Sequence, residues 1–247
     1  MPGKDLDIDE FLGTGFDLKD HLASYLRITV DQVDNRLPQA TDDLSKLHQG
    51  SFQPEDVIGF YEDQVGTAHL FELAAWHLSA SNYIADTLRL QKQFARGHVL
   101  DFGGGIGTHA LAAAALPDVD HVWFVDLNPY NRSFVLQRAF DLELADLISV
   151  HRDLESTGAI KFDTLICLDV LEHIFNPSAQ LFAFYNRLSN QSIALMNWYF
   201  FKGYQGEYPF HFDDPEMVEK FFQSLQSLFL EVFHPFLITT RAYKPIF

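Results

Sequence analysis

The spacing of apolar residues along the chain changes near residue 98. Before that point, apolar positions return every three or four residues, which is typical of amphipathic helices. The spacing is clearest at Phe71, Ala74, Ala75 and Leu78. We expect short helices up to about residue 50, broken near Pro38 and Gly50, and then one long helical stretch from Pro54 to about Gln93. Pro54 suits a helix start, because proline is tolerated in a first turn.

After residue 98, short apolar runs alternate with amphipathic segments. The runs predict strands over residues 98–102, 122–127, 147–153, 162–171 and 192–200. Helices are expected between them over residues 108–116, 131–146 and 177–188, and a further helix over 217–230. The tail after that helix can supply one or two terminal strands. This alternation predicts an α/β fold, doubly wound, with a mostly parallel sheet that is covered on both faces.

Composition and charge narrow the class of partner. Hydrophobic residues make up 47% of the 247 residues, as in an ordinary globular protein, and the formal net charge is −17. Such a charge repels phosphate backbones and anionic membrane surfaces, so we expect neither a nucleic-acid nor a membrane partner. Cys167 is the only cysteine, which fits a reducing compartment. No apolar stretch is long enough to span a bilayer, and the acidic start lacks a signal-peptide pattern, so we expect a cytoplasmic protein.

The segment VLDFGGGIGTHAL, residues 99–111, combines a strand-like run with a glycine-rich turn. Glycine weakens regular elements and is useful where the backbone needs unusual torsions or a close neighbour. The spacing of Gly103, Gly105 and Gly107 is not the dinucleotide fingerprint, whose third glycine would fall at Thr108, and no P-loop lysine follows. We therefore expect a ligand other than a dinucleotide or ATP against this loop.

Acidic residues stand at or just beyond the ends of the predicted strands. They are Asp101, Asp126, Asp153 and Asp169. In an open parallel sheet, ligands bind beyond the carboxyl ends of the strands. Carboxylates accept hydrogen bonds from hydroxyl and amino groups, so the ligand should present those groups. Two alternatives stay open, because Asp126 could cap the next helix and Asp153 could belong to a loop and cap.

The segments VLDFGGGIGTHAL, FVDLNP and FDTLICLDVLEHI resemble the successive motifs of S-adenosylmethionine-dependent methyltransferases with the seven-stranded Rossmann-like fold. The resemblance covers residues from about 95 to 200, and implies S-adenosylmethionine as cofactor and S-adenosylhomocysteine as product. It also implies a helical N-terminal extension or lid over residues 1–93 and a cofactor-binding domain over 94–247. The glycine loop would lie against the methionine part of the cofactor, with Asp101 and Asp169 at its amino-acid end. Ribose and adenine would be bound by Asp126 with Leu127 and by Asp153 with Leu154.

The stretch DVLEHI allows a further possibility. It is similar to methyltransferases of ubiquinone synthesis, some of which bind a divalent metal through acids and a histidine there. Asp169, Glu172 and His173 offer suitable ligand atoms. Because no further matched ligand is evident elsewhere in the sequence, we expect no metal. Glu172 and His173 could equally support the loop that follows the strand.

Residues 197–216 carry the most unusual composition, with eight aromatic residues among twenty. They could pack on the core, or form a wall for a small apolar or aromatic acceptor. His211 is the first candidate for a general base, with Asp213 and Asp214 near enough to orient it. His173 is the second candidate, and Tyr61 could close the pocket from the N-terminal region.

Methyl transfer to an oxygen or nitrogen of a small metabolite is therefore the expected activity. Alternatives are an aminopropyl transferase or a dehydrogenase of the same fold, a cofactor-binding module without activity, and methylation of a protein. The missing third glycine disfavours a dehydrogenase, and the aromatic segment disfavours polyamine substrates. The N-terminal helices could also form a homodimer.

Overall fold

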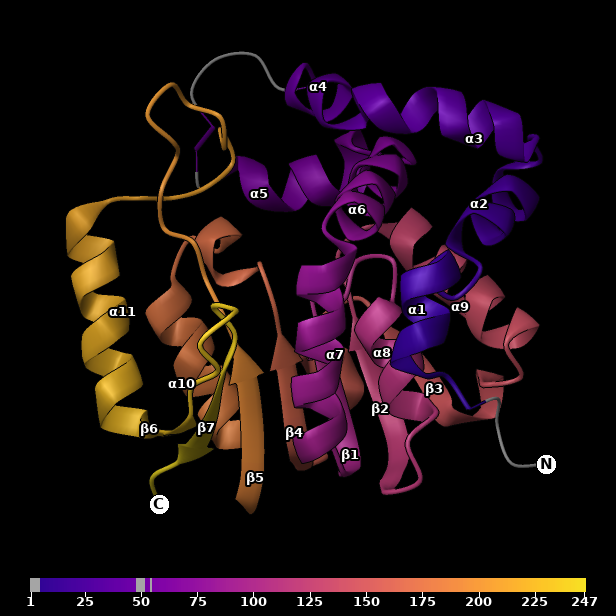
Figure 1. Cartoon of the computed structure of the whole chain (residues 1–247). Helices are drawn as coiled ribbons and strands as arrows, with labels where there is room; N and C mark the ends of the chain where they lie inside the picture. The colour runs from indigo at the N-terminus through magenta and orange to yellow at the C-terminus, as the bar shows by residue number, and fades with distance from the viewer. Residues whose placement is uncertain (1–4, 48–51, 54) are drawn as a thin grey trace.

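A computed structural model describes residues 5–47, 52–53 and 55–247 (Figure 1). The expected helix break at Gly50 and the helix start at Pro54 lie outside these residues. Within them, no helix is long and apolar enough to cross a membrane.

One mixed sheet forms the centre of the fold, and it has the seven strands that the sequence predicts. The strand order is β3-β2-β1-β4-β5-β7-β6, and β7 runs antiparallel to both of its neighbours. The order reverses between β1 and β4, which is where ligands bind in such sheets. The strands are β1 (Gly97–Phe102), β2 (Val119–Val125), β3 (Ile148–His151), β4 (Phe162–Cys167), β5 (Leu188–Met196), β6 (Phe229–Phe233) and β7 (Arg241–Pro245).

Helices cover both faces of the sheet, because successive strand residues point to opposite sides. Val99 enters a core with α7 (Ser81–Phe94), α8 (Thr108–Ala114) and α9 (Pro129–Asp141). Its neighbour Leu100 enters a second core with α10 (Pro177–Arg187) and α11 (Pro215–Leu228). The doubly wound arrangement is thus confirmed. Short 3₁₀ helices occupy the connections: η3 (Ala145–Leu147), η4 (Glu155–Thr157) and η5 (Leu171–His173).

The N-terminal region is helical, as expected, and crosses the carboxyl edge of the sheet (Figure 1). Pro38 lies in a 3₁₀ turn between two helices, which confirms the break predicted there. The elements are α1 (Ile8–Thr14), α2 (Leu18–Leu26), α3 (Val30–Arg36), η1 (Leu37–Gln39) and α4 (Ala40–Ser45).

The single long helical stretch expected up to Gln93 is wrong. The chain forms α5 (Asp56–Gly59), a π-helical turn η2 (Phe60–Gln64), α6 (Ala68–Ser79) and α7. Gly66 interrupts it with a φ of +52°, a left-handed conformation that glycine adopts without strain, and Ala80 interrupts it with a φ of −102° and a ψ of 29°. Periodicity alone does not reveal such breaks, since apolar spacing continues across them.

Two predicted strands end four residues earlier than expected. β4 ends at Cys167 because Asp169 adopts a φ of +54°, which no strand accommodates. β5 ends at Met196, and the Asn197 side chain accepts a hydrogen bond from the Asp169 N–H at 2.6 Å. The irregular backbone beyond both strands therefore lies at the edge where the candidate site forms.

A buried arginine connects the N-terminal helices to the glycine loop. Arg138 of α9 donates to the Ile106 carbonyl at 2.9 Å and to the Gly15 and Phe16 carbonyls at 3.0 Å. Its guanidinium also contacts His21 Nδ1 at 3.3 Å. The division of the chain at residue 93 stays a prediction, and these bonds run across it.

Candidate active site

The glycine loop connects β1 to α8 and folds back onto β2. The Gly103 N–H donates to the Val125 carbonyl at 2.7 Å, and the Gly105 N–H donates to Asp126 Oδ2 at 2.9 Å. Gly107 begins α8 in the left-handed region, with a φ of +76°. The loop is thus held by backbone donors at the carboxyl edge of the sheet.

Side chains of the protein itself lie close to this loop. A Cβ atom at Gly105 would come within 2.7 Å of Leu73 Cδ1, and one at Gly107 within 2.6 Å of Val135 Cγ2. The absence of side chains here is therefore explained by packing as well as by any ligand. Since Leu73 belongs to α6, this helix lies directly over the loop.

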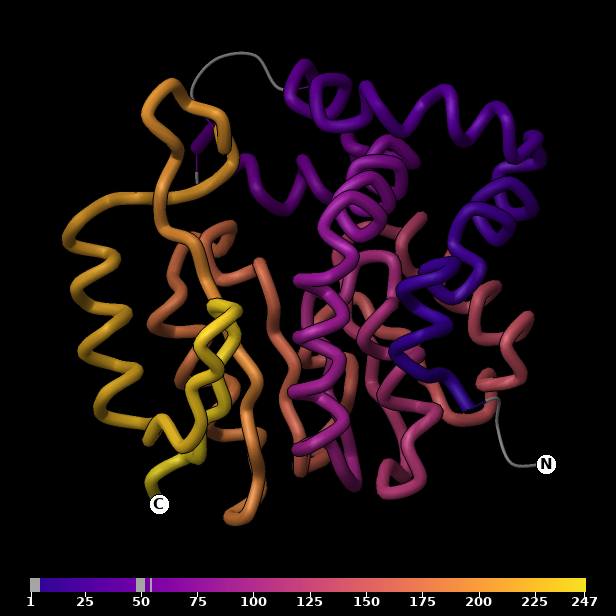
Figure 2. The backbone as a smooth tube through the Cα atoms, viewed as in Figure 1, coloured from indigo at the N-terminus to yellow at the C-terminus, as the bar shows by residue number. Residues whose placement is uncertain are grey.

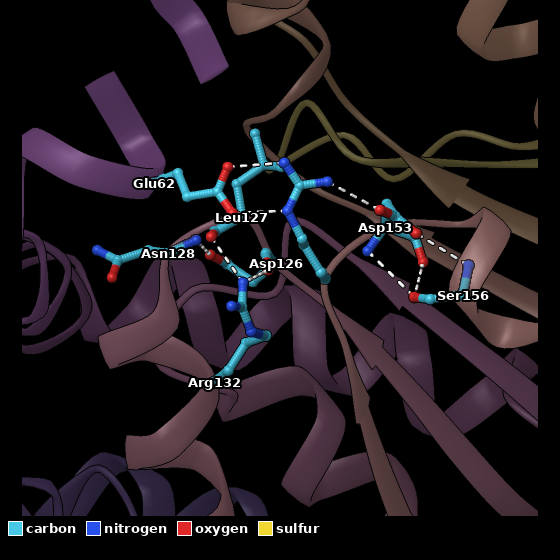
Figure 3. A network of polar contacts seen from close by, with 8 residues as sticks. Glu62, Asp126, Leu127, Asn128, Arg132, Asp153 and Ser156 are labelled. Carbon is cyan, nitrogen blue, oxygen red and sulfur yellow. Dashed lines mark hydrogen bonds and ion pairs between the residues drawn. The ribbon is translucent and has the colours of Figure 1, made fainter. Parts of the chain in front are cut away.

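Asp126 follows β2 and is 7% exposed. Besides the Gly105 N–H, its Oδ1 accepts a hydrogen bond from the Asn128 N–H at 2.8 Å (Figure 3). The same oxygen also accepts from Asn131 Nδ2 at 3.2 Å. Burial raises its pKa to about 6. A carboxylate has about four acceptor positions, so about one is left for a ligand in this conformation. The residue that caps α9 is Asn128, not Asp126.

Leu127 joins this group through its main chain. Arg132 donates to the Asp126 carbonyl at 2.7 Å and to the Leu127 carbonyl at 2.6 Å (Figure 3). The arginine thereby fixes the backbone that carries the Asp126 carboxylate, and its charge lies beside that group.

Asp153 lies beyond β3 and is bound by its own neighbours. Its Oδ1 accepts from the Ser156 N–H at 2.9 Å, and Arg152 Nη1 donates to its Oδ2 at 3.0 Å (Figure 3). Arg152 also binds Glu62 through two contacts of 2.6 Å. In the structure Asp153 therefore acts as a turn cap, and its contact with adenine stays a prediction. Leu154 is buried in the core beside α10.

Asp101 is 2% exposed, and its Oδ2 forms no hydrogen bond with any residue that the structure describes. Burial, and secondarily the charge of Asp126, raise its pKa to about 7. Asp169 accepts from Asn197 Nδ2 at 2.8 Å, and burial raises its pKa to about 6 although the residue is exposed to water. The unpaired Asp101 carboxylate fits a cationic ligand.

Two further acids of the site, Glu172 and Glu72, are not predicted from the sequence as groups that bind a cationic ligand. Glu172 is 1% exposed: its Oε1 accepts from the Tyr199 N–H at 3.0 Å, and its Oε2 has no partner among the described residues. Burial raises the pKa of Glu172 to about 8 and that of Glu72, on α6, to about 7. An acid within the apolar run LFELAA was the available signal for Glu72. We call the five acids the acidic cluster: Glu72, Asp101, Asp126, Asp169 and Glu172.

The three candidate catalytic residues lie together. The Tyr61 hydroxyl is 3.1 Å from His173 Nδ1, and the His173 and His211 ring centroids are 4.7 Å apart. Desolvation, with the charges of Glu72, Glu172 and Asp126, holds the pKa of Tyr61 above its usual range. Tyr61 therefore adjoins the acidic cluster from the N-terminal side.

Both histidines have Nδ1 within 3.1 Å of a backbone carbonyl, Phe210 for His173 and Phe201 for His211. Since a carbonyl only accepts, Nδ1 carries the proton and Nε2 keeps its lone pair. Burial lowers the pKa of His211, and lowers that of His173 to about 3, so both rings are neutral at pH 7.

The expected orientation of His211 by neighbouring acids is wrong. Asp214 accepts from the Met217 N–H as the cap of α11, because Pro215 begins that helix. Asp213 lies 3.8 Å from Lys202 Nζ and acts on His211 only as a nearby charge. The Phe201 carbonyl holds the ring instead.

One group in the described part of the chain has metal-ligand spacing. Glu172, His173 and His211 each offer a ligand atom, and these atoms lie within 4.8 Å of one another. Asp169, which the sequence suggested as a companion of the first two, does not belong to this group because it pairs with Asn197. The absence of a metal stays a prediction.

Some aromatic residues of the segment after β5 pack in a core, and others lie beside the candidate site. Its chain rises beyond the carboxyl edge of the sheet toward α5 (Figure 2), where Phe210 and Phe212 pack with Phe52 and Phe60. Tyr199 and Tyr208 are about half exposed and contact His211, at centroid distances of 5.9 and 5.0 Å. A groove of about 530 Å³ runs beside this segment, lined by Phe52, Phe175, Lys202, Phe212 and Met217, among others.

Residues 75–199, just over half of the chain, match the family described as a methyltransferase domain. The chain belongs to this family, and S-adenosylmethionine is its methyl donor. This assignment favours methyl transfer over aminopropyl transfer, dehydrogenation or binding without activity. No curated protein matches the sequence.

Solved structures are similar in fold. An O-methyltransferase family protein from Burkholderia thailandensis has a TM-score of 0.52 and 11% identity, covering 72% of this chain and 59% of that one. An S-adenosylmethionine-dependent methyltransferase from Clostridium acetobutylicum ATCC 824 has a TM-score of 0.48 and 14% identity, covering 70% and 97%. An rRNA methylase from Streptococcus thermophilus has a TM-score of 0.46 and 13% identity, covering 66% and 95%. The first likeness confirms the methyltransferase fold.

Proposed function

We propose that the protein transfers the methyl group of S-adenosylmethionine to an oxygen or nitrogen of a small apolar or aromatic molecule. The observation that supports this most strongly is the placing of the unpaired Asp101 carboxylate and a pair of neutral histidines at the same edge of the sheet. The cofactor is cationic, and carboxylates stabilise cations in a partly desolvated site.

In this proposal the cofactor lies along the carboxyl edge from β4 to β3. Its methionine part contacts the loop with Gly103, Gly105 and Gly107, and Asp101 and Asp169 bind its amino-acid end. Ribose is bound at Asp126 and Leu127, and adenine near Asp153 and Leu154. When bound, the cofactor supplies a methyl group that its sulfonium already activates. The protein must then hold the acceptor in line with that group and exclude water.

The acceptor loses its proton at the histidine pair. His211 is the first candidate to accept it through Nε2, His173 the second, and Tyr61 closes the pocket against them. A general base must be unprotonated at the working pH and still basic, so His211 suits this role better than His173, whose pKa of about 3 makes it a weak base. The half-exposed Tyr199 and Tyr208 form the wall on which an apolar or aromatic acceptor would lie.

The charge of the chain supports a small-molecule acceptor over RNA, since a net charge of −17 opposes binding of a phosphate backbone. A cytoplasmic location and a homodimer through the N-terminal helices are part of the same proposal. Exposed Leu12 and Val30 on these helices could contribute to such a dimer.

Transfer of a labelled methyl group to separate pools of small aromatic metabolites, RNA and protein tests the proposal. We expect label in the small-molecule pool alone, and label confined to RNA or protein would contradict the acceptor class. His211→Ala should lower turnover while cofactor affinity stays within about twofold. Equal loss of turnover and affinity would make His211 a structural residue.

A further inference from the structure

We propose that the acceptor is an amine, bound as its ammonium ion by Glu172 beside an aromatic wall. The inference rests on the proposed function and narrows the acceptor atom to nitrogen. Three observations, on hydrogen bonding, on charge and on aromatic packing, lead to it independently.

The first observation is the unused oxygen of Glu172. Its Oε2 is buried without a hydrogen bond to any described residue, while Oε1 is already held by the Tyr199 N–H. No described lysine or arginine pairs with this carboxyl group. Because a buried carboxylate without a partner is unfavourable, a donor from outside the chain would stabilise it, and an ammonium group supplies both hydrogen and charge.

The second observation is an excess of acids over the charge of the cofactor. S-adenosylmethionine carries a sulfonium, an ammonium and a carboxylate, and so has one net positive charge. With Asp101 and Asp169 at its amino-acid end and Asp126 at its ribose, Glu72 and Glu172 remain without a role toward the cofactor. Within the described residues, Asp126 is the one member of the acidic cluster whose pKa an arginine lowers. These desolvated acids favour a second cationic molecule over a neutral alcohol or phenol, because a cation stabilises their charged form.

The third observation is the group of aromatic rings that adjoins Glu172 through the Tyr199 backbone. Tyr199 both donates its N–H to Glu172 and packs its ring against Tyr208 at a centroid distance of 5.4 Å. Tyr208 stacks on His211 at 5.0 Å. Faces of aromatic rings attract ammonium ions, and a carboxylate beside such rings adds a direct partner. An alcohol would gain from neither interaction to the same extent.

The chemical step is balanced with the groups present. The bound ammonium gives one proton to the neutral His211 imidazole, which frees the lone pair of the nitrogen. The nitrogen–carbon bond then forms as the sulfur–carbon bond breaks, and S-adenosylhomocysteine leaves as a neutral sulfide. The methylated ammonium keeps the positive charge, and the proton on His211 passes to water.

Calorimetry with a matched pair of probes tests the inference. The protein saturated with S-adenosylhomocysteine is titrated with 2-phenylethylamine and with its uncharged isostere 2-phenylethanol. We expect the amine to bind at least tenfold more tightly. Glu172→Gln, which keeps the acceptor for the Tyr199 N–H, should reduce this ratio to about one. Glu207→Gln, an exposed acid of the same segment, should leave it unchanged.

Equal binding of both probes, tighter binding of the alcohol, or no binding of either would overturn the amine assignment. Failure of S-adenosylhomocysteine to bind when the protein is first saturated with it would instead contradict the proposed function.

Discussion

Removal of the Asp126 carboxylate should destabilise the fold as well as weaken cofactor binding. The carboxylate accepts from the backbone N–H groups of Gly105 and Asn128, both buried beneath α6 and α9. A buried donor left without a partner costs about 1–3 kcal/mol, so Asp126→Ala should lower the free energy of unfolding by about 2–6 kcal/mol. Asp126→Asn keeps one acceptor oxygen, and should lose about half as much.

Urea unfolding of the ligand-free protein measures this loss, with Asp141→Ala as the matched control. Asp141 is an exposed carboxylate at the end of α9, and its removal should change stability by less than about 0.5 kcal/mol. If Asp126→Ala is as stable as the wild type, the carboxylate does not hold the glycine loop. The interpretation of this edge of the sheet as a preformed site would then be refuted.

Two further predictions concern the buried Arg138 and the pH dependence of binding. Arg138→Met should lower the free energy of unfolding by at least about 3 kcal/mol in the same assay, because at least two charged hydrogen bonds of about 1.5–3 kcal/mol each are lost. A smaller loss would contradict the role of Arg138 in joining the N-terminal helices to the glycine loop. Asp101 has a pKa of about 7, so it gains its charge as the pH rises from 6 to 8, and affinity for the cationic cofactor should increase over that range. The same shift means that the folded protein holds a proton that the unfolded chain loses, so this group makes stability fall between about pH 4 and 7. Asp101→Asn should flatten both dependences.

The sheet could be predicted because its strands are buried on both faces and are therefore continuous apolar runs. Val99 and Leu100 enter opposite cores, where a polar side chain without a partner would be unfavourable. The helix breaks at Gly66 and Ala80 could not be predicted in the same way. There the apolar spacing continues, and only the packing of α6 over the glycine loop requires the chain to turn.

The site could be predicted only in part. Acids at strand ends are visible in the sequence, and so are the residues that come together as Tyr61, His173 and His211. The sequence does not show which hydrogen-bond partner each side chain has. For this reason the prediction that Asp213 and Asp214 orient His211 is wrong. Glu72 was missed because it comes from a distant helix, whose contact with the sheet depends on the tertiary fold.

The most direct test of the account is calorimetric titration of S-adenosylmethionine into the wild type, Asp101→Asn and the surface control Asp141→Asn. We expect one cofactor per chain, at least tenfold weaker binding for Asp101→Asn, and no change for the control. Absence of binding to the wild type, or binding to Asp101→Asn that is as tight as wild type, would contradict the claim that the carboxyl edge of this sheet holds the methyl donor.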